Sequence, residues 1–405
     1  MHGPDTKAPA LAVWALGVTQ IVGYGTLYYS FAILAPAMAL DLGLPHQWVF
    51  AALSLALFLG SLLAPAAGRM ADRLGAGHVM TVGSASSALA LAACALAPER
   101  ISFIAALVAM QLASCFVLYA TAFVAIVQIG PLGAQRSITH LTLIAGFAST
   151  LFWPVTTWLH GFLDWRAVYL VFAGLNLLLC IPIHAWLMHL SRARQVLGSN
   201  APAAALAPLR TMPLEPARIR LVFALMMAGF AIEGFVLSAV LLHMVPLLTA
   251  LGLGMAGTLV STLFGPSQVA SRLVNMLFGG RLSQAILAVI ATVLLAVGLA
   301  VLLLTAPSLS GIAAFVVLFG LGSGLISIVG GTLPLEMFGR QGYGSRVGWM
   351  SAARQFSSSF APFVFAVMMA RASVPLSIGA LWVVALCGVA VFAMIAMAGR
   401  RRLDP

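Results

Sequence analysis

Residues 68–75 read GRMADRLG and form a short polar stretch between two long apolar runs, 47–67 and 78–97. A membrane-spanning helix needs about 20 apolar residues, and each of these runs has that length. The glycines at the two ends of the stretch permit a tight turn. The segment therefore predicts two membrane helices joined by a short basic loop, and the rest of the chain repeats this alternation.

The composition supports a membrane protein. Of the 405 residues, 62% are hydrophobic and only 7% are charged, against about 25% charged in an ordinary soluble domain. The mean hydropathy is +1.09. So few charged residues cannot cover a soluble globule of this length, which excludes a soluble enzyme, a nucleic-acid-binding domain and a disordered protein.

Apolar runs separated by polar or Gly/Pro breaks predict an all-α integral membrane protein with twelve transmembrane helices. Helices are required because lipid cannot satisfy backbone polar groups. The predicted spans are 10–39, 47–67, 78–97, 101–129, 138–159, 167–189, 219–248, 257–279, 285–306, 310–333, 347–370 and 376–398. The first run is too long for a signal-peptide core, so we expect it to be retained as a span.

The net charge of +11 follows the membrane topology. With the N-terminus in the cytoplasm, the outer loops hold three arginines, Arg100, Arg166 and Arg371. The inner loops and tail hold fourteen: Arg69, Arg73, Arg136, Arg192, Arg194, Arg210, Arg218, Arg220, Arg281, Arg340, Arg346, Arg400, Arg401 and Arg402. This bias predicts cytoplasmic N- and C-termini and a multi-pass protein of the inner membrane, and it removes the argument for a nucleic-acid partner.

The long polar stretch 190–218 divides the chain into two lobes of six helices, 1–189 and 219–405. Two halves of six spans are typical of secondary transporters. A weak internal repeat agrees: GRMADRLG (68–75) and GGRLSQ (279–284) are each the second inner loop of their half.

The turn at 68–75 also contains a candidate gate. Asp72 can pair with Arg69 or Arg73, or face the N-terminus of a helix from the other half. Such contacts would hold the inner side closed and break when it opens. The alternative is a turn that only sets topology through its arginines.

GxxADRxG, formed here by Gly68, Ala71, Asp72, Arg73 and Gly75, resembles the inner-loop signature of the major facilitator superfamily. DWRAVY (164–169) is similar to an outer element that precedes the sixth span of these proteins. With twelve spans and a long central loop, the resemblance covers essentially the whole chain. It implies a carrier of two six-helix lobes that works by alternating access.

Charged residues inside spans are informative because each costs about 2.5–3.5 kcal/mol at the bilayer centre. Arg272 lies nine residues before Arg281, so about 13 Å from the inner boundary. Gln268 shares its helix face. The planar guanidinium matches a carboxylate, so Arg272 is a candidate anion-binding residue. The alternative is an arginine that holds two helices together.

An arginine in the middle of span eight, with a polar residue four positions earlier, is similar to the monocarboxylate porter branch of the superfamily. The segment GYGTLYYSFAILAP (23–36) also resembles this branch. The resemblance implies that Arg272 binds the substrate carboxylate. Several members have Asp where this chain has Gln268, and that Asp serves in proton coupling.

Glu233 is the only acidic residue deep in a span, about 20 Å from the inner boundary by its distance from Arg220. A carboxyl in a dry site can hold a proton near neutral pH, so Glu233 is our first candidate for proton coupling. It could also pair with a polar residue or line a wet cavity. His140 and His243 are further candidates, although each more often makes one structural hydrogen bond.

Tyrosines and amides complete the candidate binding residues. Tyr24 and Tyr28 share a face at four-residue spacing and could bond substrate oxygens, or they could anchor the helix at an interface. Asn275 is a further candidate for the cavity. Arg354 and Gln355 lie early in the span 347–370 and are candidates for the inner gate.

No cofactor or metal site is predicted. Cys94, Cys115, Cys180 and Cys387 lie in apolar runs with no CxxC pair, which is typical of buried packing residues. His243 and the nearby methionines could suggest soft-metal transport, but eighteen methionines in so apolar a chain are more simply packing. Motifs of ATP-driven pumps and hydrolases are absent from the sequence.

The sequence therefore predicts a secondary transporter and no enzyme. Its expected substrate is a small organic anion, a monocarboxylate, and its expected coupling ion is the proton. The carrier is expected to be a monomer surrounded by the lipid bilayer. The alternative is efflux of a drug or metabolite by proton antiport. A sensor on the same fold would usually need a soluble appendage, and a membrane enzyme would need more acidic or histidine residues in its spans.

Overall fold

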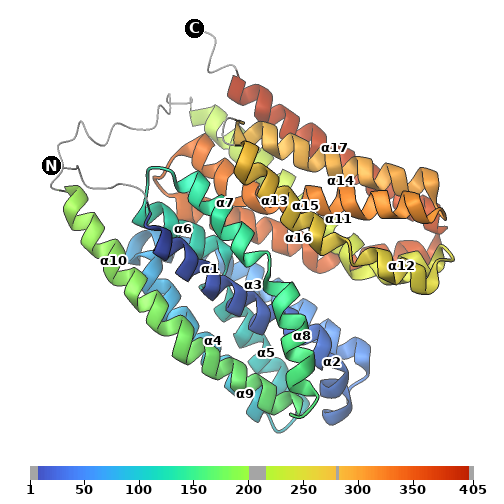
Figure 1. Cartoon of the computed structure of the whole chain (residues 1–405), viewed down its shortest axis with the longest axis horizontal. Helices are drawn as coiled ribbons and strands as arrows, with labels where there is room; N and C mark the ends of the chain where they lie inside the picture. Colours follow the sequence, from blue (N-terminus) through green and yellow to red (C-terminus); the bar gives the residue numbers. More distant parts are fainter. Residues whose placement is uncertain (1–7, 200–215, 280–281, 401–405) are drawn as a thin grey trace. The chain divides into compact units, whose positions relative to one another are not determined.

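The computed structural model describes residues 8–199, 216–279 and 282–400. Over these ranges the regular secondary structure is helical and contains no β-strand (Figure 1). The chain divides into two compact units. Unit 1 comprises residues up to 210 and 339–352, and unit 2 comprises 211–338 and 353–405, in each case as far as they are described.

Unit 1 contains the helices that are blue to green in Figure 1. In chain order they are α1 (Ala10–Tyr24), the π-helical turn η1 (Gly25–Tyr29), α2 (Ser30–Asp41), α3 (His46–Leu74), α4 (Ala76–Leu96), α5 (Arg100–Ser114), α6 (Tyr119–Ile129), α7 (Ala134–Ala145), α8 (Ala148–His160), α9 (Trp165–Leu175), the π-helical turn η2 (Asn176–Cys180) and α10 (Ile181–Ser199).

Unit 2 contains the remaining helices, yellow-green to red in the same figure. They are α11 (Pro216–Ala250), α12 (Gly254–Ser261), α13 (Phe264–Phe278), α14 (Gln284–Thr305), α15 (Leu309–Phe338), α16 (Tyr343–Arg371) and α17 (Val374–Arg400). The first ten residues of α16 belong to unit 1 and the rest to unit 2.

Each of the twelve predicted spans corresponds to helical structure. Four of them are interrupted at a break between consecutive helices or at a π-helical turn: α1–η1–α2, α5–α6, α7–α8 and α9–η2–α10 in unit 1. In unit 2 the eighth span is divided into α12 and α13. The prediction of an all-α fold with twelve spans is therefore confirmed, and the departures from regular helix lie inside spans.

Ten of these segments are long and apolar enough to cross a membrane by length and composition alone. The other two segments are the eighth span, which is divided into α12 and α13, and the eleventh span, α16. The helices α12 and α13 are each shorter than a bilayer requires. The helix α16 contains Ser, Gln and Arg among its apolar residues, which lowers its hydropathy. Their polar or broken character makes these two segments candidates for a functional role.

The linker predicted at 190–218 is partly helical. The helix α10 continues to Ser199, ten residues beyond the predicted end of its span, and α11 begins at Pro216. Residues 200–215, with Arg210, lie outside the described residues, as do 280–281 and 401–405 with Arg281, Arg401 and Arg402.

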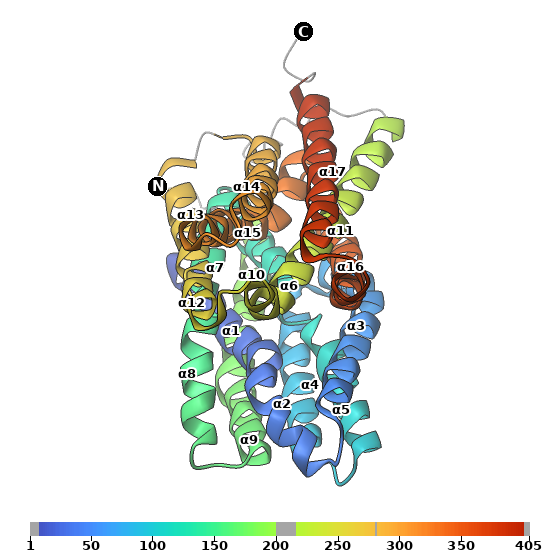
Figure 2. The same ribbon diagram turned by 90° about the vertical axis from the view of Figure 1, so that its right-hand side faces the viewer.

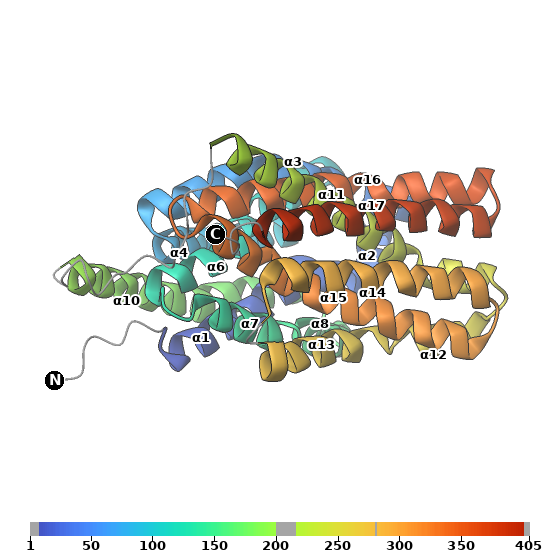
Figure 3. The same cartoon turned by 90° about the horizontal axis from the view of Figure 1, so that it is seen from above.

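Within unit 1 the helix α4 is central, since it packs against α5, α9 and α10. Figure 2 shows α8 and α9 running alongside each other in this unit. A buried core, with Leu34, Phe103 and Tyr169 among its members, joins these helices. In unit 2, α14 packs along both α15 and α17, and Figure 3 shows α14 and α15 side by side.

Large apolar side chains also lie on the outside of both units. Leu40, Leu178 and Leu304 are 85%, 76% and 82% exposed. Apolar surface on this scale would make a soluble protein aggregate, whereas lipid tails solvate it. The exposed residues are therefore those expected of a protein surrounded by a bilayer.

Candidate functional site

The prediction of a loop over 68–75 is wrong: residues 68–74 are the last two turns of α3, and Gly75 alone separates α3 from α4. Inside unit 1, this end of α3 packs closely against the beginning of α16. The Asp72 carboxylate accepts hydrogen bonds from the backbone N–H groups of Gly344 (Oδ1, 2.8 Å) and Ser345 (Oδ2, 2.8 Å). These are among the first N–H groups of α16, which have no partner within the helix. A negative charge there also interacts favourably with the helix dipole.

Glycines make this approach possible. A Cβ at Gly68 would overlap the carbonyl oxygen of Gly344, and a Cβ at Gly348 would lie 2.6 Å from the carbonyl oxygen of Ala64. Gly75 has a φ of 88°, which favours glycine, and it ends α3. Of the two geometries that the sequence left open for Asp72, the structure has the helix N-terminus. Arg69 and Arg73 are exposed.

A cavity of about 310 Å³ lies beside this junction. Asp72, Gln128, Arg340 and Tyr343 are among its lining residues. Gln128 joins the end of α3 to the start of α4, since its Oε1 accepts from the N–H of Ala76 at 2.8 Å and its Nε2 donates to the carbonyl of Ala71 at 2.9 Å. Partial burial lowers the pKa of the Arg340 guanidinium, because burial disfavours its charged form.

Arg272 lies in α13 of unit 2 and is only 5% exposed. Its Nε donates to the hydroxyl of Ser327 at 3.1 Å and to the carbonyl of Gly324 at 3.4 Å, both in α15. Gly324 lies close to α13, because a Cβ there would be 2.5 Å from the carbonyl oxygen of Gln268. The guanidinium therefore joins α13 to α15 through its Nε.

Gln268 and Asn275 lie on the same helix as Arg272 and are half-buried. The Gln268 Nε2 donates to the hydroxyl of Ser323 in α15 at 2.7 Å. Gln268, Arg272 and Ser327 thus form a polar seam along the contact of α13 with α15. This seam is the structural setting of the predicted anion-binding residues.

Glu233 is 1% exposed in α11, and neither carboxyl oxygen has a hydrogen-bond partner among the described residues. The carboxyl is directed at α17, where Gly388 makes room for it: a Cβ at Gly388 would lie 2.7 Å from Oε1. The prediction of a deep, dry position for this carboxyl agrees with the structure. Whether it carries a proton in transport stays a prediction.

The two histidines have different surroundings. The His243 Nδ1 lies 3.0 Å from the carbonyl of Ala239, and its ring contacts Phe365 at 5.3 Å between centroids. This is one structural hydrogen bond within α11 plus a packing contact. His140 is half-buried in α7, one turn after Arg136.

Tyr24 ends α1, and Tyr28 lies in the π-helical turn η1 that follows, which the sequence did not predict. Across η1 the helix is wider than an α-helix, so the four-residue spacing of Tyr24 and Tyr28 does not describe the packing. The rings that meet are Tyr24 and Tyr29, at 6.3 Å, and Tyr24 and Tyr119 of α6, at 4.8 Å. Tyr28 packs on Tyr29 at 5.4 Å and is 43% exposed.

The sequence analysis missed a buried polar contact between the two π-helical turns. Asn176, at the start of η2, donates from Nδ2 to the hydroxyl of Thr26 in η1 at 3.1 Å. Gln111 of α5 donates to the carbonyl of Leu27 in η1 at 2.9 Å. Single π-helical turns often occur at functional sites. A lone Asn in the apolar run 167–189 was the available signal.

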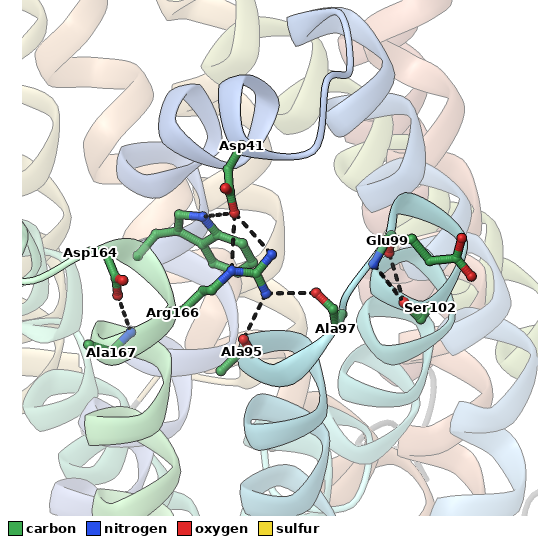
Figure 4. A network of polar contacts seen from close by, with 9 residues as sticks. Asp41, Ala95, Ala97, Glu99, Ser102, Asp164, Arg166 and Ala167 are labelled. Atoms are coloured by element: carbon green, nitrogen blue, oxygen red, sulfur yellow. Dashed lines mark hydrogen bonds and ion pairs between the residues drawn. The ribbon is translucent and has the colours of Figure 1, made fainter.

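The outer element DWRAVY forms a second network, shown in Figure 4. Arg166 donates to Asp41 Oδ2 through Nε (3.1 Å) and pairs with the same oxygen through Nη2 (2.9 Å); its Nη1 donates to the carbonyls of Ala95 (2.8 Å) and Ala97 (2.7 Å). The indole of Trp165 donates to Asp41 and also lies 4.4 Å from the guanidinium. This network joins the ends of α2, α4 and α9.

Metal-binding clusters are not found in 8–199, 216–279 and 282–400, where no three His, Cys, Asp or Glu side chains gather. Cys94 and Cys180 are buried, Cys115 is half-buried and Cys387 is exposed, all as free thiols.

A polytopic all-helical fold with a close glycine contact between α3 and α16, five interrupted spans and buried polar contacts is typical of a membrane transporter. A profile of the Major Facilitator Superfamily matches residues 16–362, and the chain belongs to that superfamily. It is a secondary transporter and a multi-pass membrane protein. No curated protein matches the sequence at a significant level.

Solved structures share the fold at low sequence identity. The human organic anion transporter MFSD10 (TETRAN) has a TM-score of 0.69 and 15% identity, covering 94% of this chain and 98% of its own. The proton:xylose symporter XylE bound to 6-bromo-6-deoxy-D-glucose has 0.71 and 12%, covering 96% of both. The transporter FucP in the outward conformation has 0.64 and 14%, covering 95% and 98%. These structures show a shared fold, and the family profile identifies the superfamily and not the monocarboxylate porter branch.

Proposed function

We propose that this carrier moves a small organic anion, a monocarboxylate, in symport with protons by alternating access. The observation that carries the proposal is Arg272, a guanidinium that is 5% exposed inside the membrane region of unit 2. Because a charged side chain is costly to bury inside a membrane, one that is present there is a candidate for a functional role. A carboxylate matches the guanidinium geometry better than a neutral substrate does.

Gln268, Asn275, Tyr24 and Tyr28 complete the proposed set of substrate contacts. Gln268 and Asn275 are on the helix of Arg272, and amides or phenols can bond the oxygens of an organic anion. The similarity in fold to an organic anion transporter is compatible with this substrate class. The proposed branch is that of the monocarboxylate porters.

The proposed gate is the junction of Gly68, Arg69, Asp72, Arg73 and Gly75 with the start of α16. The hydrogen bonds of Asp72 to Gly344 and Ser345, both 2.8 Å, would form when the inner side of the carrier is closed and break when it opens. The proposed proton site is Glu233, with His140 and His243 behind it, because an unpartnered carboxyl in a dry site is stable in its neutral form.

We further propose that the carrier is a monomer of the inner membrane with both termini in the cytoplasm. Its proposed lobes are 1–189 and 219–405, joined by 190–218, with the start of α16 packing in unit 1. The arginine bias of the inner loops supports this orientation.

Purified protein in liposomes tests the proposal. Uptake of a panel of labelled monocarboxylates, dicarboxylates, sugars and organic cations would be measured with and without an inward proton gradient. We expect accumulation of a monocarboxylate that depends on the gradient. Accumulation only when the gradient is reversed, or transport only of neutral or cationic compounds, would favour proton-antiport efflux instead.

A further inference from the structure

The Glu233 carboxyl is buried without a hydrogen-bond partner among the described residues. A cationic residue, Arg354, packs against Gly234, the next residue in the chain. Arg354 is eleven residues into α16, about 16 Å from the start of that helix. Its side-chain stem passes over Gly234, the neighbour of Glu233, because a Cβ at Gly234 would lie 2.9 Å from Arg354 Cγ. Arg354 lies in the part of α16 that belongs to unit 2, and its role in an inner gate stays a prediction.

Hydrogen bonds hold α11 and α16 together at this level. Ser358 donates from its hydroxyl to the carbonyl of Gly234 at 2.9 Å, and Ser238 donates to the carbonyl of Ser358 at 2.9 Å. Ser358 and Ser238 are each one helical turn beyond Arg354 and Gly234. These two hydrogen bonds therefore fix the backbone around Glu233 and Arg354.

The two groups interact electrostatically, yet they do not form an ion pair within 4 Å: among the described residues, the ion pair found is that of Arg166 with Asp41. Burying a carboxylate without a partner is strongly unfavourable. A structure with this separation therefore suits a neutral, protonated Glu233. The half-buried Arg354 has a long flexible stem with which to change its position.

Resting on the proton coupling proposed above, we propose that Arg354 binds the Glu233 carboxylate once its proton has left. The O–H bond of the carboxyl breaks, its electron pair remains on the carboxylate, and the proton passes to water. The guanidinium then compensates the new negative charge. Arg354 thus acts as the positioning residue that sets the pH at which Glu233 releases its proton.

Among the described residues of unit 2, Arg354 is the cation that interacts electrostatically with Glu233. Arg272 lies on α13 and donates to α15. Toward Glu233, α17 presents Gly388, and its described titratable groups are the exposed Cys387 and the terminal Arg400. The helix α12 has no titratable side chain, and α15 has Glu336 near its end. On α11 itself, Arg218 and Arg220 lie at the start and His243 lies ten residues beyond Glu233. Arg346 and Arg371 lie at the ends of α16.

An infrared pH titration of the purified full-length protein in lipid nanodiscs tests the pairing without a substrate. The protonated-carboxyl band of Glu233 is assigned by its loss in Glu233→Gln. Arg354→Gln should move the midpoint of this band to higher pH by about one unit, a tenfold change in proton affinity. Arg371→Gln, which removes the same charge about 25 Å along the same helix, should leave it unchanged. An unchanged midpoint in Arg354→Gln overturns the proposal.

A thermal double-mutant cycle provides a second measurement. At pH 9, Arg354→Gln should lower the unfolding temperature more than at pH 5, because it leaves an unpaired buried carboxylate. In the Glu233→Gln background the same change should have little effect at either pH. This double variant has no buried charge at the site, so it should fold even if Arg354→Gln alone does not. Equal effects in both backgrounds would refute the pairing.

These readouts separate the pairing from the transport proposal. A titration shift together with no proton-driven carboxylate uptake in liposomes would retain the pair and refute the proposed function. Proton-driven uptake together with no shift and no coupling would retain the function and refute the role of Arg354.

Discussion

At the scale of single residues, the proposal gives Arg272 two tasks. Its Nε bonds to Ser327 and Gly324 orient the side chain from α15, and its guanidinium is proposed to bind the substrate carboxylate. Orientation by a neighbouring helix would reduce the entropy lost when substrate binds. The same bonds make the residue sensitive to any movement between α13 and α15.

Arg272→Lys tests the fork. Lysine keeps the charge but loses the planar pair of donors and the Nε bonds, so we expect uptake of the carboxylate selected by the liposome panel to fall at least tenfold. Arg220→Lys, an exposed arginine at the start of α11, serves as the control. Wild-type uptake by Arg272→Ala at equal expression would remove Arg272 from the site.

Arg166→Lys tests the outer network. The change removes the bonds to the carbonyls of Ala95 and Ala97 and weakens the contact with Asp41. Hydrogen bonds to charged groups contribute about 1.5–3 kcal/mol each when buried. Since the Arg166 side chain is 28% exposed and water screens it, we expect a total loss of about 1 kcal/mol, or an unfolding temperature about 2 °C lower.

The readout is thermal unfolding in detergent, with Arg371→Lys as an exposed control. An Arg166→Lys protein as stable as the wild type would show that the network of Figure 4 contributes nothing measurable.

At this scale the sequence singles out candidate residues but does not predict what they contact. Asp72, Glu233 and Arg272 stand out because a charge among apolar residues is costly. The partners of Asp72 and Arg272, such as the backbone of Gly344 and the hydroxyl of Ser327, are uncharged groups more than fifty residues away. Only the packing of helices brings them close, and a single sequence contains no record of that packing.

At the scale of helices, the departures from regular geometry were the part that periodicity could not predict. The turns η1 and η2 have apolar sequences, GTLYY and NLLLC, that are equally compatible with an α-helix. The wider turn is stabilised by tertiary bonds to Thr26 and Leu27 from other helices. Twelve spans were predictable because lipid imposes helix on any apolar run of sufficient length.

The helix α16 gives the clearest prediction at this scale. Asp72→Asn keeps the shape of the side chain but replaces one accepting oxygen by an amide that cannot accept from an N–H group. One of the two bonds to α16 and the interaction with its dipole are lost, a cost of about 1 kcal/mol. We expect slower turnover and greater reactivity of cysteines introduced beside the junction toward a reagent added on the cytoplasmic side.

Asp164→Asn is the matched control. Asp164 also caps a helix in unit 1, accepting from the N–H of Ala167 at 2.7 Å, and asparagine is an equally good N-cap. If Asp72→Asn changes neither turnover nor reactivity, Asp72 contributes to topology and not to gating.

At the scale of the whole molecule, the internal repeat is more evident in the structure than in the sequence. Gln128, at the end of the fourth span, accepts from the N–H of Ala76 at the start of α4. Glu336, at the end of the tenth span, accepts from the N–H of Gln284 at the start of α14, also at 2.8 Å. The two halves therefore use the same device, a side chain that caps a neighbouring span, although GRMADRLG and GGRLSQ have diverged.

The units differ in their buried ionisable groups, and this difference matters for transport. Among Asp, Glu, His, Lys and Arg, Glu233 and Arg272 are the two side chains that are at least 95% buried in the described part of unit 2, and His184 is the one in the described part of unit 1. His184 bonds to Ser84 at 2.8 Å between α10 and α4, which is a structural contact. Both the anion site and the proton site are thus proposed for unit 2, where one could act on the other through α15, which packs against α11 and α13.

Glu233→Gln tests this division of tasks in the working carrier. Glutamine imitates a carboxyl that is always protonated, so the variant should still bind substrate and exchange it across the membrane, because exchange needs no net release of a proton. It should fail to concentrate substrate under a proton gradient, because the empty carrier can no longer load and unload a proton. Counterflow and gradient-driven uptake of the same labelled carboxylate in liposomes measure the two activities, with the exposed Glu99→Gln as control. If Glu233→Gln still concentrates substrate, the proton site must be assigned to His140 or His243 instead. If Glu233→Gln loses exchange as well, Glu233 contacts the substrate directly.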